Sequence, residues 1–117
     1  MSLSKEQLIE VTNNVRMLIQ ESPTSYPERL SQILVELTSL RATLSEEYRD
    51  TAILRPERKR DLRSQYKTVA ETNWAYEASP EGKKEAWLKG WLDDIKDVKA
   101  SIKARLQTLH DDAYGQY

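Results

Sequence analysis

The chain has 117 residues, of which 38% are hydrophobic and 32% charged, and its formal net charge at pH 7 is −1. It contains no cysteine, which excludes disulfides, thiolate metal sites and a cysteine nucleophile. With only three glycines and four prolines, the composition favours a single domain built from long amphipathic helices.

The first predicted helix spans residues 4–21. Ser4 and Gln7 have the spacing of a capping box, in which each side chain bonds the other residue's backbone N–H. The stretch 22–27 contains two prolines and three hydroxyl residues, which favour a turn over a continued helix. We therefore expect the first helix to end there.

The second predicted helix spans residues 27–54 and begins at Pro27, because proline suits the first turn of a helix. Its apolar residues recur at steps of three and four, which places them on one face. These residues are Leu30, Ile33, Leu37, Leu40, Leu44 and Tyr48.

A third helix is predicted over residues 56–78, after the break at Arg55-Pro56. Its thin apolar face consists of Leu62, Tyr66, Val69, Ala70, Asn73 and Tyr76. An alternative is a kink at Pro56, which would make residues 27–78 one bent rod.

The last predicted helix, residues 79–110, is the longest. Ser79 can cap it, Pro80 suits its first position, and Glu81 and Glu85 place negative charge at the positive end of the helix dipole. One apolar stripe follows, made of Leu88, Trp91, Ile95, Val98, Ile102, Leu106 and Leu109.

Short breaks between the predicted helices imply antiparallel neighbours. We therefore expect an all-α fold, an antiparallel bundle of about four helices in which the second and fourth are long, or a pair of long hairpins. Residues 1–110 would form a single helical domain, and residues 111–117 a flexible acidic and aromatic tail.

The sequence offers little for catalysis. Its one histidine, His110, is expected to complement the carbonyl end of the last helix, and Gln107 stands where a di-iron Glu-x-x-His motif requires glutamate. Two acidic groups resemble those with which helical nucleotide pyrophosphohydrolases hold magnesium. These groups are Glu46, Glu47 and Asp50, and Asp93, Asp94 and Asp97, whose neighbouring lysines and arginines also fit a solvated surface.

Residues 55–67 are the most basic stretch, with six positive and two negative side chains. The positive residues are Arg55, Arg58, Lys59, Arg60, Arg63 and Lys67. Three interpretations remain open for them: a solvated helix start, a surface for an acidic protein, or contacts to nucleic acid.

Trp74, Trp87 and Trp91 surround the break at residues 78–80, where a hairpin can bring them together in a local core. Trp87 and Trp91 cannot both share one direction with Leu88 and Leu92 on the same helix. One indole is therefore expected to stay exposed, and exposed tryptophan is typical of interaction hot spots.

The last helix carries a tryptophan-bearing, charged stretch, Trp91-Leu92-Asp93-Asp94-Ile95-Lys96-Asp97-Val98-Lys99-Ala100. In a short, cysteine-free chain this stretch resembles small all-helical accessory proteins encoded by bacteriophages. The resemblance implies a recombination accessory, a structural factor or an inhibitor of host defence.

The leading hypothesis is a non-enzymatic helical module for protein–protein contact, with a homodimer or larger assembly expected and no metal or cofactor. The alternatives are a nucleic-acid-binding accessory that uses residues 55–67 and a magnesium-dependent nucleotide hydrolase. No apolar run approaches the roughly 20 residues of a membrane span, and the first residues lack a signal-peptide layout. We accordingly expect a cytoplasmic protein without a membrane partner.

Overall fold

The computed structural model describes residues 3–115, and the side chains of residues 3–112. Every regular element in this part of the chain is helical. The elements are α1 (Lys5–Glu21), a short 3-10 helix η1 (Ser22–Thr24), α2 (Pro27–Ala52), α3 (Arg55–Arg63), α4 (Val69–Ala78) and α5 (Pro80–Gly115). The predicted all-α class is confirmed.

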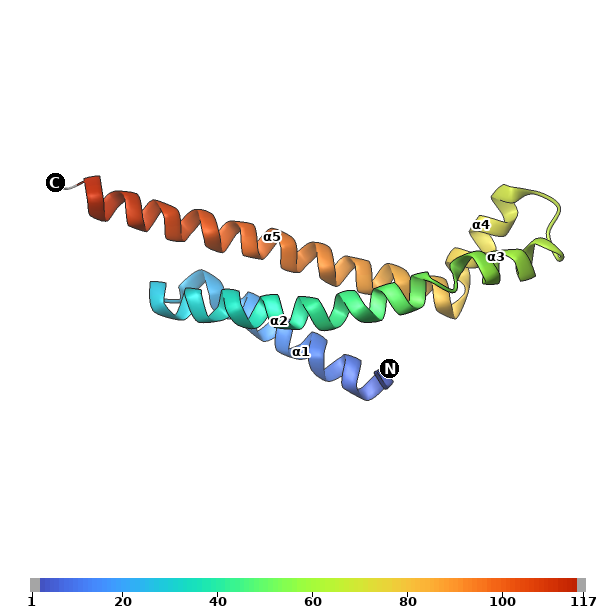
Figure 1. Ribbon diagram of the computed structural model, residues 1–117, viewed down its shortest axis with the longest axis horizontal. Helices are drawn as coiled ribbons and strands as arrows, with labels where there is room; N and C mark the ends of the chain where they lie inside the picture. Colours follow the sequence, from blue (N-terminus) through green and yellow to red (C-terminus); the bar gives the residue numbers. More distant parts are fainter. Residues whose placement is uncertain (1–2, 116–117) are drawn as a thin grey trace.

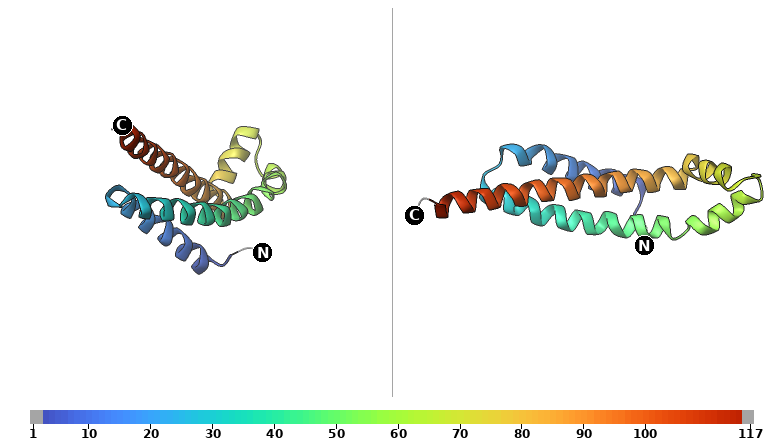
Figure 2. Two further views of the ribbon diagram at one scale, coloured as in Figure 1. Left: turned by 60° about the vertical axis from the view of Figure 1, so that its left-hand side comes forward. Right: turned by 90° about the horizontal axis from the view of Figure 1, so that it is seen from above.

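The long helices α2 and α5 pack antiparallel along most of their length, as predicted, and α1 lies against both (Figures 1 and 2). The helices α3 and α4 form a hairpin at one end of this arrangement. The molecule is elongated, with principal extents of 69 × 28 × 19 Å. The bundle proper therefore consists of three helices, and the hairpin extends it lengthwise.

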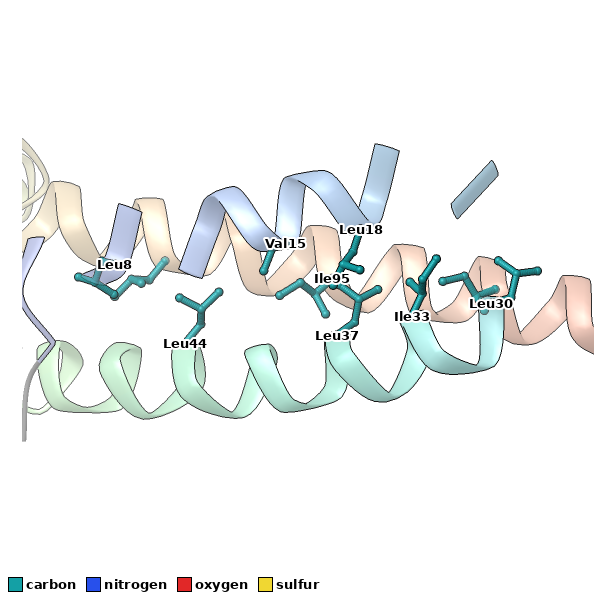
Figure 3. Close-up of a cluster of buried hydrophobic side chains, with 10 residues drawn as sticks. Leu8, Val15, Leu18, Leu30, Ile33, Leu37, Leu44 and Ile95 are labelled. Atoms are coloured by element: carbon teal, nitrogen blue, oxygen red, sulfur yellow. The ribbon is translucent and has the colours of Figure 1, made fainter. Parts of the chain in front are cut away.

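The core forms where α1, α2 and α5 meet (Figure 3). Each helix contributes buried side chains seven residues apart, the spacing that keeps an apolar seam facing its neighbours in left-handed bundles. The buried core residues are Leu8, Val15 and Leu18 of α1, Leu30, Ile33, Leu37 and Leu44 of α2, and Leu88, Ile95 and Ile102 of α5. The apolar faces predicted for residues 27–54 and 79–110 thus supply most of the core.

The helix starts follow the local sequence. The predicted capping box is present: the Ser4 side chain accepts from the Gln7 backbone N–H, and the Gln7 side chain accepts from that of Ser4. Pro27 and Pro56 lie in the first turns of α2 and α3, where a missing N–H costs no hydrogen bond.

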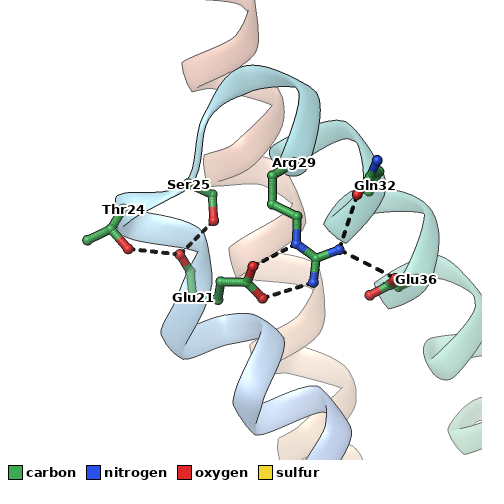
Figure 4. Close-up of polar contacts among 6 residues, drawn as sticks. All are labelled: Glu21, Thr24, Ser25, Arg29, Gln32 and Glu36. Carbon is green, nitrogen blue, oxygen red and sulfur yellow. Dashed lines mark hydrogen bonds and ion pairs between the residues drawn. The ribbon is translucent and has the colours of Figure 1, made fainter.

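The turn between α1 and α2 is fixed by an ion pair (Figure 4). Arg29 donates from Nε to Oε1 of Glu21 at 2.6 Å and from Nη2 to Oε2 at 2.9 Å. Arg29 also lies 3.6 Å from a carboxylate oxygen of Glu36. The hydrogen bonds from Arg29 lower the pKa of the Glu21 carboxyl below its ordinary value.

The prediction of one helix over residues 56–78 is wrong. The chain leaves the helix after Arg63 and re-enters it at Val69, with Thr68 as N-cap accepting from the backbone N–H of Glu71 at 3.1 Å. Of the apolar face predicted there, Tyr76 is buried, whereas Val69 is 63% exposed. A turn therefore replaces the middle of the predicted helix and folds α4 back along α3.

The structure also clarifies the break before α3. Ile53 and Leu54, the two residues between α2 and α3, keep right-handed helical backbone angles. As a result α3 continues α2 with a bend (Figure 1). The bent rod considered as an alternative therefore exists, but it ends at Arg63.

The last helix is longer than predicted. α5 continues past His110 to Gly115, so residues 111–115, assigned to a flexible tail, are helical. Residues 116–117 and the side chains beyond residue 112 lie outside the described part. Because α5 runs on, His110 does not mark the end of the helix as predicted.

Candidate functional site

The basic segment 55–67 does not form one patch, because part of it builds the junction between the hairpin and α5. Arg55 pairs with the carboxylate of Glu85, and Arg58 lies 3.5 Å from that of Glu81. The ammonium of Lys59 lies over the ring of Tyr76, 5.4 Å from its centroid. Three of the six predicted binding cations thus hold the fold together.

Glu85 is the centre of this junction. Its side chain is buried, accepts a hydrogen bond of 2.6 Å from the Tyr76 hydroxyl and accepts another of 3.2 Å from Nε of Arg55. One carboxylate on α5 therefore joins α3 and α4. Sequence reasoning placed Glu85 only at the helix dipole and missed this role, since nothing in the spacing links it to Tyr76.

The other three cations, Arg60, Arg63 and Lys67, are exposed at the far end of the hairpin. Arg63 donates to the backbone carbonyl of Tyr66 at 2.7 Å, which closes the turn after α3. Arg60 and Lys67 make no ion pair within 4.0 Å in the described part of the chain. The positive charge available to a ligand is therefore about half of what the sequence suggests.

The three tryptophans have three different surroundings and do not form one local core. Trp91 packs against the bundle core, with the guanidinium of Arg16 5.8 Å from its ring centroid. Trp74 on α4 is 75% exposed, so together with Trp87 two indoles lie at the surface where one was expected. Trp87 is 41% exposed and lines a groove.

This groove, here named the α1–α5 groove, lies between the start of α1 and the start of α5 and has a volume of about 740 Å³. Its lining is mostly apolar, and the three polar side chains that line it are all lysines. The lining residues are Leu3, Leu8, Ile9, Pro80 and Trp87 together with Lys5, Lys83 and Lys84. No carboxylate is among the described residues that line it.

A buried carboxylate beneath the groove ties its two sides together. Glu47 of α2 is 2% exposed, accepts from the backbone N–H of Leu3 and lies 3.4 Å from the ammonium of Lys84. Because these bonds reach the segment before α1 and the first turns of α5, Glu47 positions both walls. The sequence grouped Glu47 with possible magnesium ligands, but its oxygens are engaged by protein groups.

The other acidic residues of the predicted metal groups also remain apart. Asp93, Asp94 and Asp97 are exposed on α5. Within residues 3–112, no three histidine, cysteine, aspartate or glutamate side chains are grouped so that they could hold a metal ion. The arrangement thus offers an apolar, lysine-bordered surface.

One charged cluster was missed at the sequence level, because it combines residues from two helices. The pKa of Lys99 on α5 is lowered by partial burial and by the positive charges of Lys103 and Arg41, the last of which is on α2. The three cations repel one another in the native state. Helical spacing links Lys99 to Lys103, but only the packing of α2 on α5 brings in Arg41.

Comparison of the chain with models of protein families, with curated proteins and with solved structures finds no match. Among the described residues, no helix is both long and apolar enough to cross a membrane. The fold and the groove define the class of protein: an all-helical chain with an exposed apolar groove bordered by positive charge.

Proposed function

We propose that this protein is a non-enzymatic helical module for protein–protein contact, which binds an amphipathic helix in the α1–α5 groove. The single observation that carries the proposal is the groove itself, about 740 Å³ of largely apolar space lined by Trp87 and by no described carboxylate. A role as an accessory, assembly or inhibitor factor follows, because such a module acts by binding a helix of its partner protein.

The apolar lining supports a helix as ligand. Ile9 is 45% and Trp87 41% exposed, although both lie beside the buried Leu8 at the edge of the core. A bundle of three helices leaves such a seam between two of its members, and a fourth helix would cover it. Tryptophan in a partly enclosed apolar site is a typical binding hot spot.

The lysines support a ligand with carboxylates. Lys5 and Lys83 are exposed at the border of the groove, whereas Lys84 is half-buried and paired with Glu47. Their charge favours acidic residues on both sides of an apolar helix face and disfavours basic ones, so it supplies selectivity and faster association.

Two designed helical peptides test this proposal. They share leucines at positions i, i+3, i+4 and i+7, and their flanking positions carry glutamate in one peptide and lysine in the other. We expect the acidic peptide to bind with a Kd in the micromolar range, at least about tenfold more tightly than the basic one, with an affinity that falls as salt rises. Isothermal titration calorimetry measures both.

Two matched variants locate the site. Trp87→Glu should abolish binding of the acidic peptide, whereas Trp74→Glu should leave it unchanged, because Trp74 lies on α4 away from the groove. Circular dichroism at 222 nm establishes that both variants stay helical. Equal binding by the two variants, or equal affinity for the two peptides, would contradict the proposal.

A second candidate function is nucleic-acid binding by the hairpin, and one observation favours it. Arg60, Arg63 and Lys67 are exposed on the same hairpin as Trp74, and an indole can stack on a base. Fluorescence anisotropy with a labelled single-stranded DNA would show affinity that falls steeply with salt and is lost in Arg60→Glu with Lys67→Glu. The pairing of Arg55 and Arg58 with glutamates makes this the weaker candidate.

A further inference from the structure

We propose that the helix that fills the α1–α5 groove is the C-terminal part of α5 from a second copy of this chain, in a two-fold symmetric, antiparallel dimer. This inference rests on the proposed function, since it names the partner of the same groove. It draws on three features: the projecting end of α5, the spacing of residues along α5, and the charges at its two ends.

The C-terminal part of α5 projects beyond the rest of the bundle (Figure 1). Arg105 makes the last described contact with the turn between α1 and α2, and beyond it α5 extends past the rest of the bundle (Figure 1). Leu109, in this part, is 40% exposed although it continues the apolar stripe of α5. This end of the helix therefore presents apolar surface that the monomer leaves uncovered.

A chain cannot place this end in its own groove. Lys83, at the groove, and Asp112 lie on the same straight helix, and 29 positions at 1.5 Å each separate them by about 44 Å. The starts of α1 and α5, which line the groove, therefore lie far from the C-terminal end of α5 along the molecule (Figure 1). Only another molecule can bring the two together.

The spacing along α5 fits an antiparallel pair. Trp87 follows Lys83 by one helical turn, and Asp112 follows Leu109 by nearly one turn. When a second α5 runs in the opposite direction and Lys83 lies opposite its Asp112, Trp87 lies within one residue of the position opposite its Leu109. Two-fold symmetry then forms each of these contacts twice, which is how a self-complementary surface closes a dimer.

The charges and the backbone agree with this register. The exposed Asp111 and Asp112 meet the end of the groove that carries Lys5 and Lys83. Away from the centre of the helix pair, Gly90 lies opposite Arg105 of the second copy, and the structure leaves open space beside Gly90. A second helix can therefore approach α5 there without a clash.

Variants that reverse the charge of the groove or of the C-terminal end of α5 test the dimer. The groove variant carries Lys5→Glu and Lys83→Glu, and the tail variant carries Asp111→Lys and Asp112→Lys. Wild-type protein is expected to elute as a dimer, twice the 13.6 kDa of the chain, in size exclusion with light scattering. Each variant alone should dimerise at least about tenfold more weakly, because its groove and tail carry the same charge.

An equimolar mixture of the two variants should recover the dimer, since each groove then meets a tail of opposite charge. Lys96→Glu, a control at an exposed position that the proposed contacts do not use, should dimerise like wild type. Circular dichroism shows that every variant remains helical.

The outcomes separate this inference from the proposed function. If wild-type protein is monomeric at every concentration but binds the acidic peptide through Trp87, the second copy is not the partner and the groove function stands. If wild-type protein dimerises and both charge variants do so equally well, the dimer uses another surface and the inference is wrong. If the mixture fails to recover the dimer, the antiparallel register is wrong.

Discussion

The guanidinium of Arg105, near the end of α5, donates a hydrogen bond of 3.0 Å to the carbonyl oxygen of Ser22, which follows the last residue of α1. The same nitrogen donates to the carbonyl of Pro23 at 3.0 Å, and the other terminal nitrogen donates to that of Ser25 at 3.1 Å. Carbonyls at the end of a helix lack intrahelical partners. A single side chain on α5 thus donates hydrogen bonds to three backbone carbonyls in the turn between α1 and α2.

We predict that Arg105→Ala lowers the free energy of unfolding by about 1.5–3 kcal/mol, the range for hydrogen bonds to a charged group. Arg105→Lys should recover part of this loss, because an ammonium cannot match the fork that reaches all three carbonyls. Urea denaturation measures both. A loss no greater than that of Lys96→Ala, an exposed lysine on α5, would show that the bonds do not contribute.

Two glycines of α5 should respond in opposite directions to alanine. A Cβ at Gly82 would lie 1.9 Å from the carbonyl oxygen of Tyr76, so Gly82→Ala forces α4 away from α5 and should cost about 1–3 kcal/mol. A Cβ at Gly90 meets nothing within 4 Å, so Gly90→Ala should stabilise by about 0.5–1 kcal/mol through helix propensity. Thermal unfolding by circular dichroism measures the two shifts, and shifts of the same sign would refute the close packing at Gly82.

The pair beneath the groove gives a third prediction. Lys84→Met removes the charged partner of the buried Glu47 and should cost about 2–4 kcal/mol, because a buried carboxylate without a counter-charge remains. Adding Glu47→Gln to Lys84→Met should recover stability, since the amide carries no charge. Denaturant unfolding of the two single variants and the double variant completes a double-mutant cycle, and strictly additive effects would mean that the two residues are not coupled.

The ion pair of Glu21 and Arg29 predicts a pH dependence. Because Arg29 lowers the pKa of Glu21 in the folded state, the pair stabilises the protein above the ordinary glutamate pKa of about 4.3. That stabilisation is lost as the pH falls through the lowered value. In Arg29→Gln, the Glu21 pKa measured by carboxyl-detected NMR should rise, and the stability difference from wild type should shrink in acid. An unchanged Glu21 pKa in this variant would contradict the pairing.

Most of the bundle follows from the sequence, because its seams repeat along single helices. Leu30, Leu37 and Leu44 recur every seven residues, and Leu88 and Ile95 do the same, so their burial could be predicted from spacing alone. The start of α1 was equally clear from Ser4 and Gln7. These features are local and need no knowledge of the partner helix.

The turn at residues 64–68 was missed because it contains neither glycine nor proline. Its one signal is Thr68 followed three positions later by Glu71, a helix-start pattern inside what looked like continuous helix. Because the turn is not predicted, Val69 is assigned to the apolar face of one long helix, whereas the structure leaves it exposed on α4. A thin apolar face with Asn73 in it was a sign that the segment was not one buried helix.

The groove could be predicted only in part. Trp87 was singled out as a binding residue, but its neighbours Leu3 and Ile9 come from the other end of the sequence. The segment before α1 is brought to α5 by Glu47, which is buried because three helices pack around it. No local sequence pattern predicts that burial. Sites assembled across a bundle are hidden from a single sequence for this reason.

The hairpin of α3 and α4 has a further consequence for how the protein opens. α3 has no buried side chain, and the hairpin is joined to α5 through Glu85, which bonds Arg55 and Tyr76, through the ion pair of Arg58 and Glu81, and through the packing of Gly82 on Tyr76. Loss of these contacts frees α3 and α4 while α1, α2 and α5 keep their common core. In native-state hydrogen exchange, the amides of α3 should therefore exchange through local opening, long before those in the middle of α2, which are released only when the whole bundle unfolds.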